Sequence, residues 1–192
     1  VVKLLKGDYP SPRALAQLRR EFETLRELDL PGVIKAYSLE VHGDGLALVM
    51  EDAGGVPLSD VIRDRPLPLR QSLEIALSAA RTLGELHQRS LVHKDIKPHN
   101  ILLDPVTGAV KLIDFGIAMR LTHELARPHG PDALEGTLLY MSPEQSGRMN
   151  RVVDPRTDLY SLGVTLYELL TGTLPFAASD AMELIHSHIA RK

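Results

Sequence analysis

Apolar and polar positions in the first third of the chain follow a strand pattern and then a helix pattern. Residues 1–5 (VVKLL) are an apolar run interrupted by Lys3, which predicts a short strand with one outward or functional position. Ser11 followed by Pro12 predicts a helix start, because a hydroxyl can cap the first turn and proline suits the first helical position. One helical stripe of apolar residues follows: Leu15, Leu18, Phe22 and Leu25. The sequence DLPG at 29–32 predicts the end of this helix.

Two further strands and a long helix are predicted next. The runs VIKAYSLEV (33–41) and LALVME (46–51) enclose the turn HGDG, a pattern typical of two neighbouring strands. The glycines of DAGGVPL (52–58) indicate a flexible hinge. Residues 69–88 carry leucine and alanine at helical spacing, which predicts a helix.

The second half combines one highly charged loop with short strands and two helices. The stretch LVHKDIKPHNILL (91–103) places His, Lys, Asp and Asn between aliphatic residues, which indicates an active-site loop between two short buried strands, the second at 101–103. A turn then leads to a strand at 109–113. Residues 157–172 are apolar almost all round, which predicts a buried helix ending at Gly172, and an amphipathic helix is predicted at 179–190.

Composition narrows the class of protein. A chain of 192 residues with 44% hydrophobic and 24% charged residues is typical of one globular domain or of two small lobes sharing a cleft. The net charge of −3 argues against a nucleic-acid partner, and the absence of cysteine excludes disulfides and a cysteine nucleophile. No apolar run reaches the roughly 18 residues of a membrane span, and no signal-peptide pattern opens the chain. We therefore expect a cytoplasmic protein without direct membrane insertion.

The charged loop and the strands after it bring candidate chemistry together. Asp95 lies five residues before Asn100, and Asp114 follows the predicted two-strand turn, so that one hairpin can bring all three side chains around a small volume. Carboxylate and amide oxygens suit Mg²⁺, which is usually held by one or two carboxylates and by substrate phosphates. Lys97 would add a positive charge beside them. The alternative is that the three residues are ordinary turn residues.

Five ordered segments resemble the motifs of eukaryotic-type protein kinases. HKDIKPHN with the later IDFG resembles the catalytic loop and metal-binding motif, and LVMEDAGG resembles the hinge between the lobes. GTLLYMSPE resembles the end of an activation segment, and DLYSLGVTLYELLTG the helix that follows it. The resemblance implies an α+β, two-lobed fold truncated at both ends. Residues 1–51 would be the small-lobe remnant, and residues 52–192 the hinge and most of the larger lobe.

The resemblance also implies roles for the charged residues. Asp95 would accept the proton of the substrate hydroxyl, and Lys97 would stabilise the transferred phosphate. Asn100 and Asp114 would hold Mg²⁺. Lys3 would contact the ATP phosphates, unless it is a solvated lysine of an edge strand.

Other positions match the family's nucleotide site and its supporting residues. Glu21 is the expected partner of Lys3, because it lies nearer the apolar stripe of the first helix than Glu23 and Glu27 do; the alternative is a surface charge. The adenine would be held by the following residues: Met50 as gatekeeper, Glu51 and Ala53 in the hinge, and Leu102. Glu144 would be structural, Asp158 would brace the catalytic loop, and His93 would pack beneath that loop.

The resemblance favours a serine/threonine kinase that phosphorylates proteins in signalling. Lys97 and Thr137 are the residues that favour this branch. The sequence SPEQSGRMNR resembles kinase modules of large bacterial proteins that also carry an ATPase region and a sensor histidine kinase, so we expect further domains. The glycine-rich phosphate loop is expected before Val1. Lys94 stands where many kinases have arginine, which weakens the case for activation by loop phosphorylation, with Thr122 the plainest phosphosite.

Two other functions fit parts of the pattern. A pseudokinase or scaffold module that regulates attached domains would fit Lys94 and a missing glycine-rich loop. A small-molecule phosphotransferase of the aminoglycoside or choline type would share the fold and an HxDxxxxN loop, but Phe115 and the SPE segment argue against it.

Overall fold

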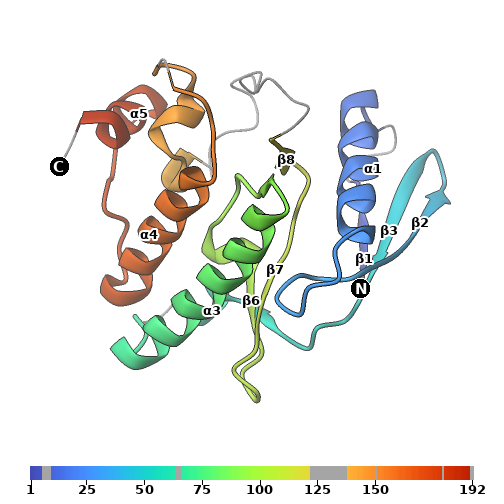
Figure 1. Cartoon of the computed structure of the whole chain (residues 1–192), viewed down its shortest axis with the longest axis horizontal. Helices are drawn as coiled ribbons and strands as arrows, with labels where there is room; N and C mark the ends of the chain where they lie inside the picture. Colours follow the sequence, from blue (N-terminus) through green and yellow to red (C-terminus); the bar gives the residue numbers. More distant parts are fainter. Residues whose placement is uncertain (6–9, 64–65, 122–137, 150, 179, 191–192) are drawn as a thin grey trace.

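The chain forms two parts, as predicted for an α+β fold. The computed structural model describes residues 1–5, 10–63, 66–121, 138–149, 151–178 and 180–190. Figure 1 shows a small sheet and one long helix at the right, the other long helices at the left, and a short hairpin between them. In this described part of the chain, no helix has both the length and the apolar character needed to cross a membrane.

The first part is a three-stranded antiparallel sheet that packs against one helix. Its elements are β1 (Val2–Leu4), α1 (Pro12–Arg26), β2 (Ala36–His42) and β3 (Gly45–Met50). The strand order is β1-β3-β2, so that β3 is central. Leu18 of α1 packs on Leu46 and Leu48 of β3 in a small core. The predicted cap is confirmed, because the backbone N–H of Ala14 donates to Ser11 Oγ at 3.2 Å.

The second part is mainly helical, with short strands between the helices. Its elements are β4 (Val56–Pro57), α2 (Leu58–Val61), α3 (Leu69–Gln88), β5 (Leu91–Val92), η1 (Pro98–Asn100), β6 (Ile101–Leu103), β7 (Val110–Leu112), β8 (Met119–Arg120), η3 (Leu138–Tyr140), η4 (Pro143–Ser146), α4 (Arg156–Thr171) and α5 (Ala181–Ala190). Strand β6 pairs with β7 on one side and with β4 on the other, and β5 pairs with β8. The main core lies between α3 and this hairpin, where Leu83, Ile101 and Leu112 are fully buried.

The structure corrects the predicted start of the second strand. The apolar pattern predicts one strand from 33 to 41, but β2 begins at Ala36. Val33 and Ile34 are buried instead in the main core, where the backbone N–H of Ile34 donates to Leu112 O at 3.1 Å. Burial of these two side chains therefore joins the segment before β2 to the second part of the molecule.

Two further expectations need correction. The predicted hinge at 52–58 is shorter, because Val56 and Pro57 pair with β6 as strand β4. The prediction that α4 is buried all round is wrong in detail: Leu159 is 51% exposed and Tyr167 is 45% exposed. The buried face combines Val164 and Leu169 with polar residues, among them Ser161, whose Oγ donates to Tyr140 O at 2.8 Å. The C-cap at Gly172 is confirmed, with φ of 73°.

Candidate active site

Lys3 connects the two parts of the molecule through two carboxylates. Its Nζ donates to Glu21 Oε1 at 2.9 Å and to Glu21 Oε2 at 2.8 Å, and it also donates to Asp114 Oδ1 at 2.9 Å. Lys3 lies in the middle of β1 and Glu21 lies on the inner side of α1, where it is only 2% exposed. The structure thus brings Glu21, rather than Glu23 or Glu27, to the lysine of the first strand.

The charges of this cluster shift one another's pKa values. Burial alone would lower the pKa of Lys3, but the carboxylates of Asp114 and Glu21 outweigh burial and raise it. Burial raises the pKa of Glu21, although Lys3 opposes the shift. Burial would also raise the pKa of Asp114, but the charge and hydrogen bond of Lys3 prevail and lower it. Lys3 therefore favours the ionised form of Asp114.

The charged loop folds around Asp95. Lys97 Nζ donates to Asp95 Oδ1 at 2.9 Å and to Oδ2 at 2.8 Å. The amide nitrogen of Asn100 donates to the backbone oxygen of Asp95 at 2.9 Å and to its Oδ2 at 2.8 Å. The backbone N–H of Ile113 donates to Asn100 O at 3.0 Å, which fastens this loop to the residue before Asp114. The two predicted groups of site residues are therefore neighbours.

Two backbone conformations in this region are unusual for residues other than glycine. Lys94 has φ of 70° and Asp114 has φ of 65°. Such left-handed conformations cost free energy and persist where the surroundings hold them in place. Here Lys94 is held through its backbone, since Asp158 Oδ1 accepts its N–H at 2.7 Å and Gln145 Nε2 donates to its oxygen at 2.9 Å.

Asp158 and His93 lie beneath the charged loop around Asp95, as the resemblance to protein kinases implies. The carboxylate of Asp158 is fully buried and accepts the backbone N–H of His93 at 2.9 Å and the ring Nε2–H of His87 at 2.8 Å, besides the bond from Lys94. His93 Nε2 donates to Ile113 O at 3.1 Å, and its ring lies 4.5 Å from that of Phe115. His93 is thus a packed residue.

The predicted adenine-binding residues lie where the two parts meet. Met50 ends β3, and its backbone N–H donates to Val1 O at 2.9 Å. Glu51 follows, with its backbone N–H donating to Lys35 O at 2.9 Å. Met50, Ala53 and Leu102 are half-buried and pack against the main core. The Glu51 carboxylate forms an ion pair with Lys111 of β7, and no local pattern in the sequence indicates this contact.

The donor atoms of Asn100 and Asp114 are compatible with a hard cation. Within the described part of the chain, both side-chain hydrogen bonds of Asn100 use its nitrogen, and its carbonyl oxygen accepts none there. The side chain of Asp114 is 40% exposed. In the residues that the structure describes, no three His, Cys, Asp or Glu side chains form a cluster that could hold a metal ion. This donor set suits Mg²⁺ bound together with substrate phosphates.

Three other predicted positions are Thr122, Thr137 and Glu144. Thr122 and Thr137 lie outside the described residues. Glu144 is half-buried, and its Oε1 accepts a hydrogen bond from Thr157 Oγ1 at 2.7 Å, so this carboxylate has a partner within the chain. Sequence reasoning missed Gln145 and His87, whose contacts join segments far apart in the chain. Neither side chain stands in a pattern that could have revealed it.

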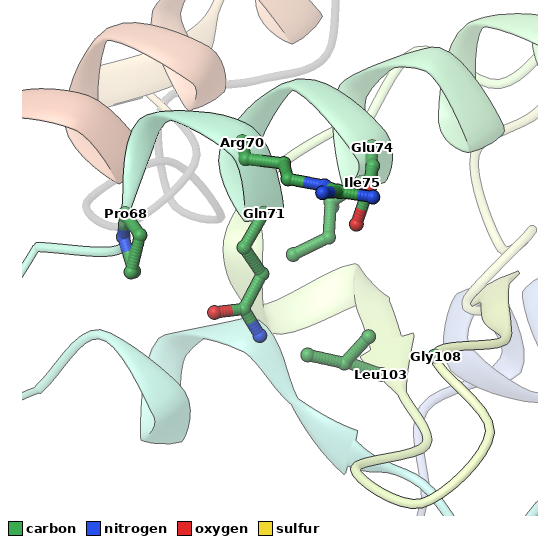
Figure 2. Close-up of a pocket in the computed structure, with 7 residues that line it drawn as sticks. All are labelled: Pro68, Arg70, Gln71, Glu74, Ile75, Leu103 and Gly108. Atoms are coloured by element: carbon green, nitrogen blue, oxygen red, sulfur yellow. Dashed lines mark hydrogen bonds and ion pairs between the residues drawn. The ribbon is translucent and has the colours of Figure 1, made fainter.

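A separate cavity lies away from these residues, between α3 and the β6–β7 hairpin. Its volume is about 350 Å³. Figure 2 shows the residues that line it: Pro68, Arg70, Gln71, Glu74, Ile75, Leu103 and Gly108. Arg70 Nε donates to Glu74 Oε1 at 2.9 Å beside this cavity. None of the predicted site residues lines it.

Comparison with known proteins identifies the family. The family model described as protein kinase domain matches residues 1–192. The chain is 36% identical over 194 residues to serine/threonine-protein kinase PknB of Mycobacterium leprae, covering 98% of the chain and 30% of that protein. It is 35% identical to serine/threonine-protein kinase PrkC of Bacillus subtilis, covering 98% of the chain and 28% of that protein. It is 37% identical to serine/threonine-protein kinase PknA of Mycobacterium tuberculosis, covering 98% of the chain and 44% of that protein.

The chain therefore belongs to the protein kinase family, whose members use ATP as a substrate. The resemblance stated from the motifs is confirmed. The chain spans between 28 and 44% of the length of these relatives. An attached ATPase region or sensor histidine kinase stays a prediction.

Proposed function

We propose that the protein is a serine/threonine kinase that transfers the γ-phosphate of ATP to hydroxyl groups of protein substrates in signalling. The observation that carries the proposal is the bonded set of Lys3, Glu21 and Asp114 next to the bonded set of Asp95, Lys97 and Asn100. Phosphoryl transfer depends mainly on positioning and on charge stabilisation. The first set holds the ammonium group of Lys3 in place for the ATP phosphates. The second set holds the carboxylate of Asp95 in place for the substrate hydroxyl.

Each residue then has a role in the reaction. The substrate hydroxyl oxygen forms a bond to the γ-phosphorus, the bond from that phosphorus to the bridging oxygen of ADP breaks, and the hydroxyl proton passes to Asp95. Lys97, which is held against Asp95, stabilises negative charge on the transferred group. Lys3 binds the phosphates nearer the nucleoside and is held in place by Glu21. Asn100 and Asp114 would hold Mg²⁺, which when bound would neutralise negative charge on the phosphates.

The nucleotide base would lie at the junction of the two parts. We assign the small lobe to residues 1–51 and the hinge and larger lobe to residues 52–192. The backbone of Glu51 and Ala53 would hold the edge of the adenine, with Met50 behind it and Leu102 beneath it. These four residues lie where β3 ends and where β6 begins its pairing with β4. We further propose a cytoplasmic location and additional domains in the same protein.

The test is transfer of labelled phosphate from Mg-ATP to a generic basic protein by the full-length protein, followed by identification of the labelled residue. We expect label on serine or threonine, and none with Asp95→Ala. Asp104→Ala is the matched control, because this aspartate lies in the exposed β6–β7 turn and hydrogen bonds to Thr107 and to backbone N–H groups there. Label on an aminoglycoside but on no protein would contradict the proposal. Nucleotide binding without any transfer would favour a scaffold.

A further inference from the structure

One ion pair joins Glu51, at the border between the small lobe and the hinge, to the second part of the molecule beside the proposed adenine site. Lys111 Nζ donates to Glu51 Oε1, although the two residues are 60 positions apart in the chain. The side chain of Lys111 is 23% exposed and that of Glu51 is 14% exposed. An ion pair with this little exposure is screened less by solvent than a surface pair. It can therefore hold the two segments in a fixed relation.

The position of Lys111 on β7 explains how it reaches the hinge. Val110 and Leu112 are buried at 5% and 0% exposure, so that Lys111, between them, points to the opposite face of the hairpin. In the β6–β7 register Lys111 pairs with Leu102. Side chains of paired residues lie on the same face of a sheet. Lys111 and Leu102 are thus neighbours on the face that carries the proposed floor of the adenine site.

A backbone connection follows the same route and does not depend on side chains. The N–H of Glu51 donates to Lys35 O at 2.9 Å, and the N–H of Ile34 donates to Leu112 O at 3.1 Å. The N–H of Leu112 in turn donates to Gly32 O at 2.8 Å. The hinge is therefore tied to β7 through residues 32–35, and the ion pair of Lys111 is a second tie to the same strand. Two residues after Leu112, the chain reaches Asp114.

We propose that Lys111 is a positioning residue for ATP, which acts by holding Glu51 so that the hinge backbone keeps its spacing from Leu102 and Asp114. This inference rests on the proposed function, since it concerns the adenine end of the same site. Lys111 itself contacts neither the proposed base Asp95 nor the cluster around Lys3 among the hydrogen bonds of the described residues. Its loss should therefore weaken nucleotide binding more than it slows the chemical step.

The test compares Lys111→Met in the full-length protein with two other variants. The matched control is Arg70→Met, because Arg70 pairs with Glu74 at 2.9 Å on an exposed surface, with side chains 90% and 62% exposed. The rescue is the charge reversal Glu51→Lys with Lys111→Glu, which restores an ion pair of the opposite polarity. For each variant kcat, the KM for ATP and the KM for the protein substrate are measured, and a urea midpoint confirms folding.

We expect Lys111→Met to raise the KM for ATP roughly three- to tenfold, the range for losing one partly buried ion pair, with kcat and the KM for the protein substrate within about twofold. The charge reversal should return the KM for ATP to within about twofold of the wild type, whereas either single reversal should not. The inference would be overturned if Lys111→Met had the same KM for ATP as Arg70→Met. It would also be overturned if the KM for ATP of the double charge reversal were no closer to the wild-type value than those of the two single reversals.

The proposed function and this inference can fail separately. Should the wild type transfer no phosphate, the proposed kinase activity fails, and Kd for ATP is then measured directly by titration. Weaker ATP binding by Lys111→Met than by Arg70→Met would still support the positioning role. Equal Kd values, or no ATP binding by the wild type, would refute it.

Discussion

Replacement of Asp158 by asparagine should destabilise the protein severely. The carboxylate of Asp158 is fully buried and accepts three hydrogen bonds, from the backbone of His93 at 2.9 Å, the backbone of Lys94 at 2.7 Å and the ring of His87 at 2.8 Å. Asparagine has nearly the same shape but offers a single acceptor oxygen. Its NH₂ group must then face at least one N–H donor that the carboxylate now satisfies.

The size of the effect follows from these three contacts. A hydrogen bond to a charged group contributes about 1.5–3 kcal/mol, and a buried donor left without its acceptor costs about 1–3 kcal/mol. With one or two of the three donors left unsatisfied, we expect a loss of about 2–5 kcal/mol. Domains of this kind have a total stability of about 5–15 kcal/mol, so the variant loses a large share of it. The urea midpoint should fall by about 1–2 M.

Urea unfolding of Asp158→Asn measures this loss, and Asp154→Asn is the control. Asp154 lies four residues earlier and pairs with Arg156, which is 83% exposed, so the same substitution there should cost at most about 1 kcal/mol. Hydrogen exchange at the amides of His93 and Lys94 should also accelerate in Asp158→Asn. A loss below about 1 kcal/mol, equal to that of the control, would refute the bracing role of this carboxylate.

Two further predictions concern Lys3 and Gly32. The pKa of Lys3 is raised above 10.5 because Asp114 and Glu21 outweigh burial, so its contribution to stability is present at neutral pH and is lost as pH rises beyond 10.5. The difference in unfolding free energy between the wild type and Lys3→Met should therefore stay constant from about pH 7 to 9 and shrink above pH 10.5; a difference that grows there would contradict this sign. A Cβ added at Gly32 would lie 1.9 Å from Thr82 Oγ1, so Gly32→Ala should cost about 1–3 kcal/mol in thermal or urea unfolding. Addition of Thr82→Ala should recover part of that loss, and full additivity of the two changes would show that no clash occurs.

Helices and short strands could be predicted because local patterns determine them. The α3 bounds of Leu69–Gln88 and the β6 bounds of Ile101–Leu103 coincide with the apolar runs in the sequence. Ser11 and Gly172 mark helix ends through hydrogen bonds and backbone conformation that depend on neighbouring residues alone. The choice of Glu21 over Glu23 also followed from helical spacing, because only one of them shares the buried face.

The features that could not be predicted from the sequence depend on tertiary packing. Val33 and Ile34 have the composition of a strand, but the main core buries them, and no local signal distinguishes the two outcomes. The polar face of α4 is buried because its side chains bond to Tyr140 and Glu144, which a pattern of apolar residues cannot reveal. The pairing of Lys111 with Glu51 also depends on the docking of β7 beside the hinge. The motifs thus located the site residues, and the fold determined the contacts that hold them.

The most direct test of the central claim is the rate of phosphate transfer with Asp95 removed. In a single-turnover experiment with saturating Mg-ATP and protein substrate, Asp95→Ala should lower the rate by about 10²–10⁴ relative to both the wild type and Asp104→Ala, the usual contribution of a positioned proton acceptor. Binding of ATP should stay close to that of the wild type. An Asp95→Ala protein that transfers phosphate at the wild-type rate would contradict the assignment of this loop as the catalytic centre.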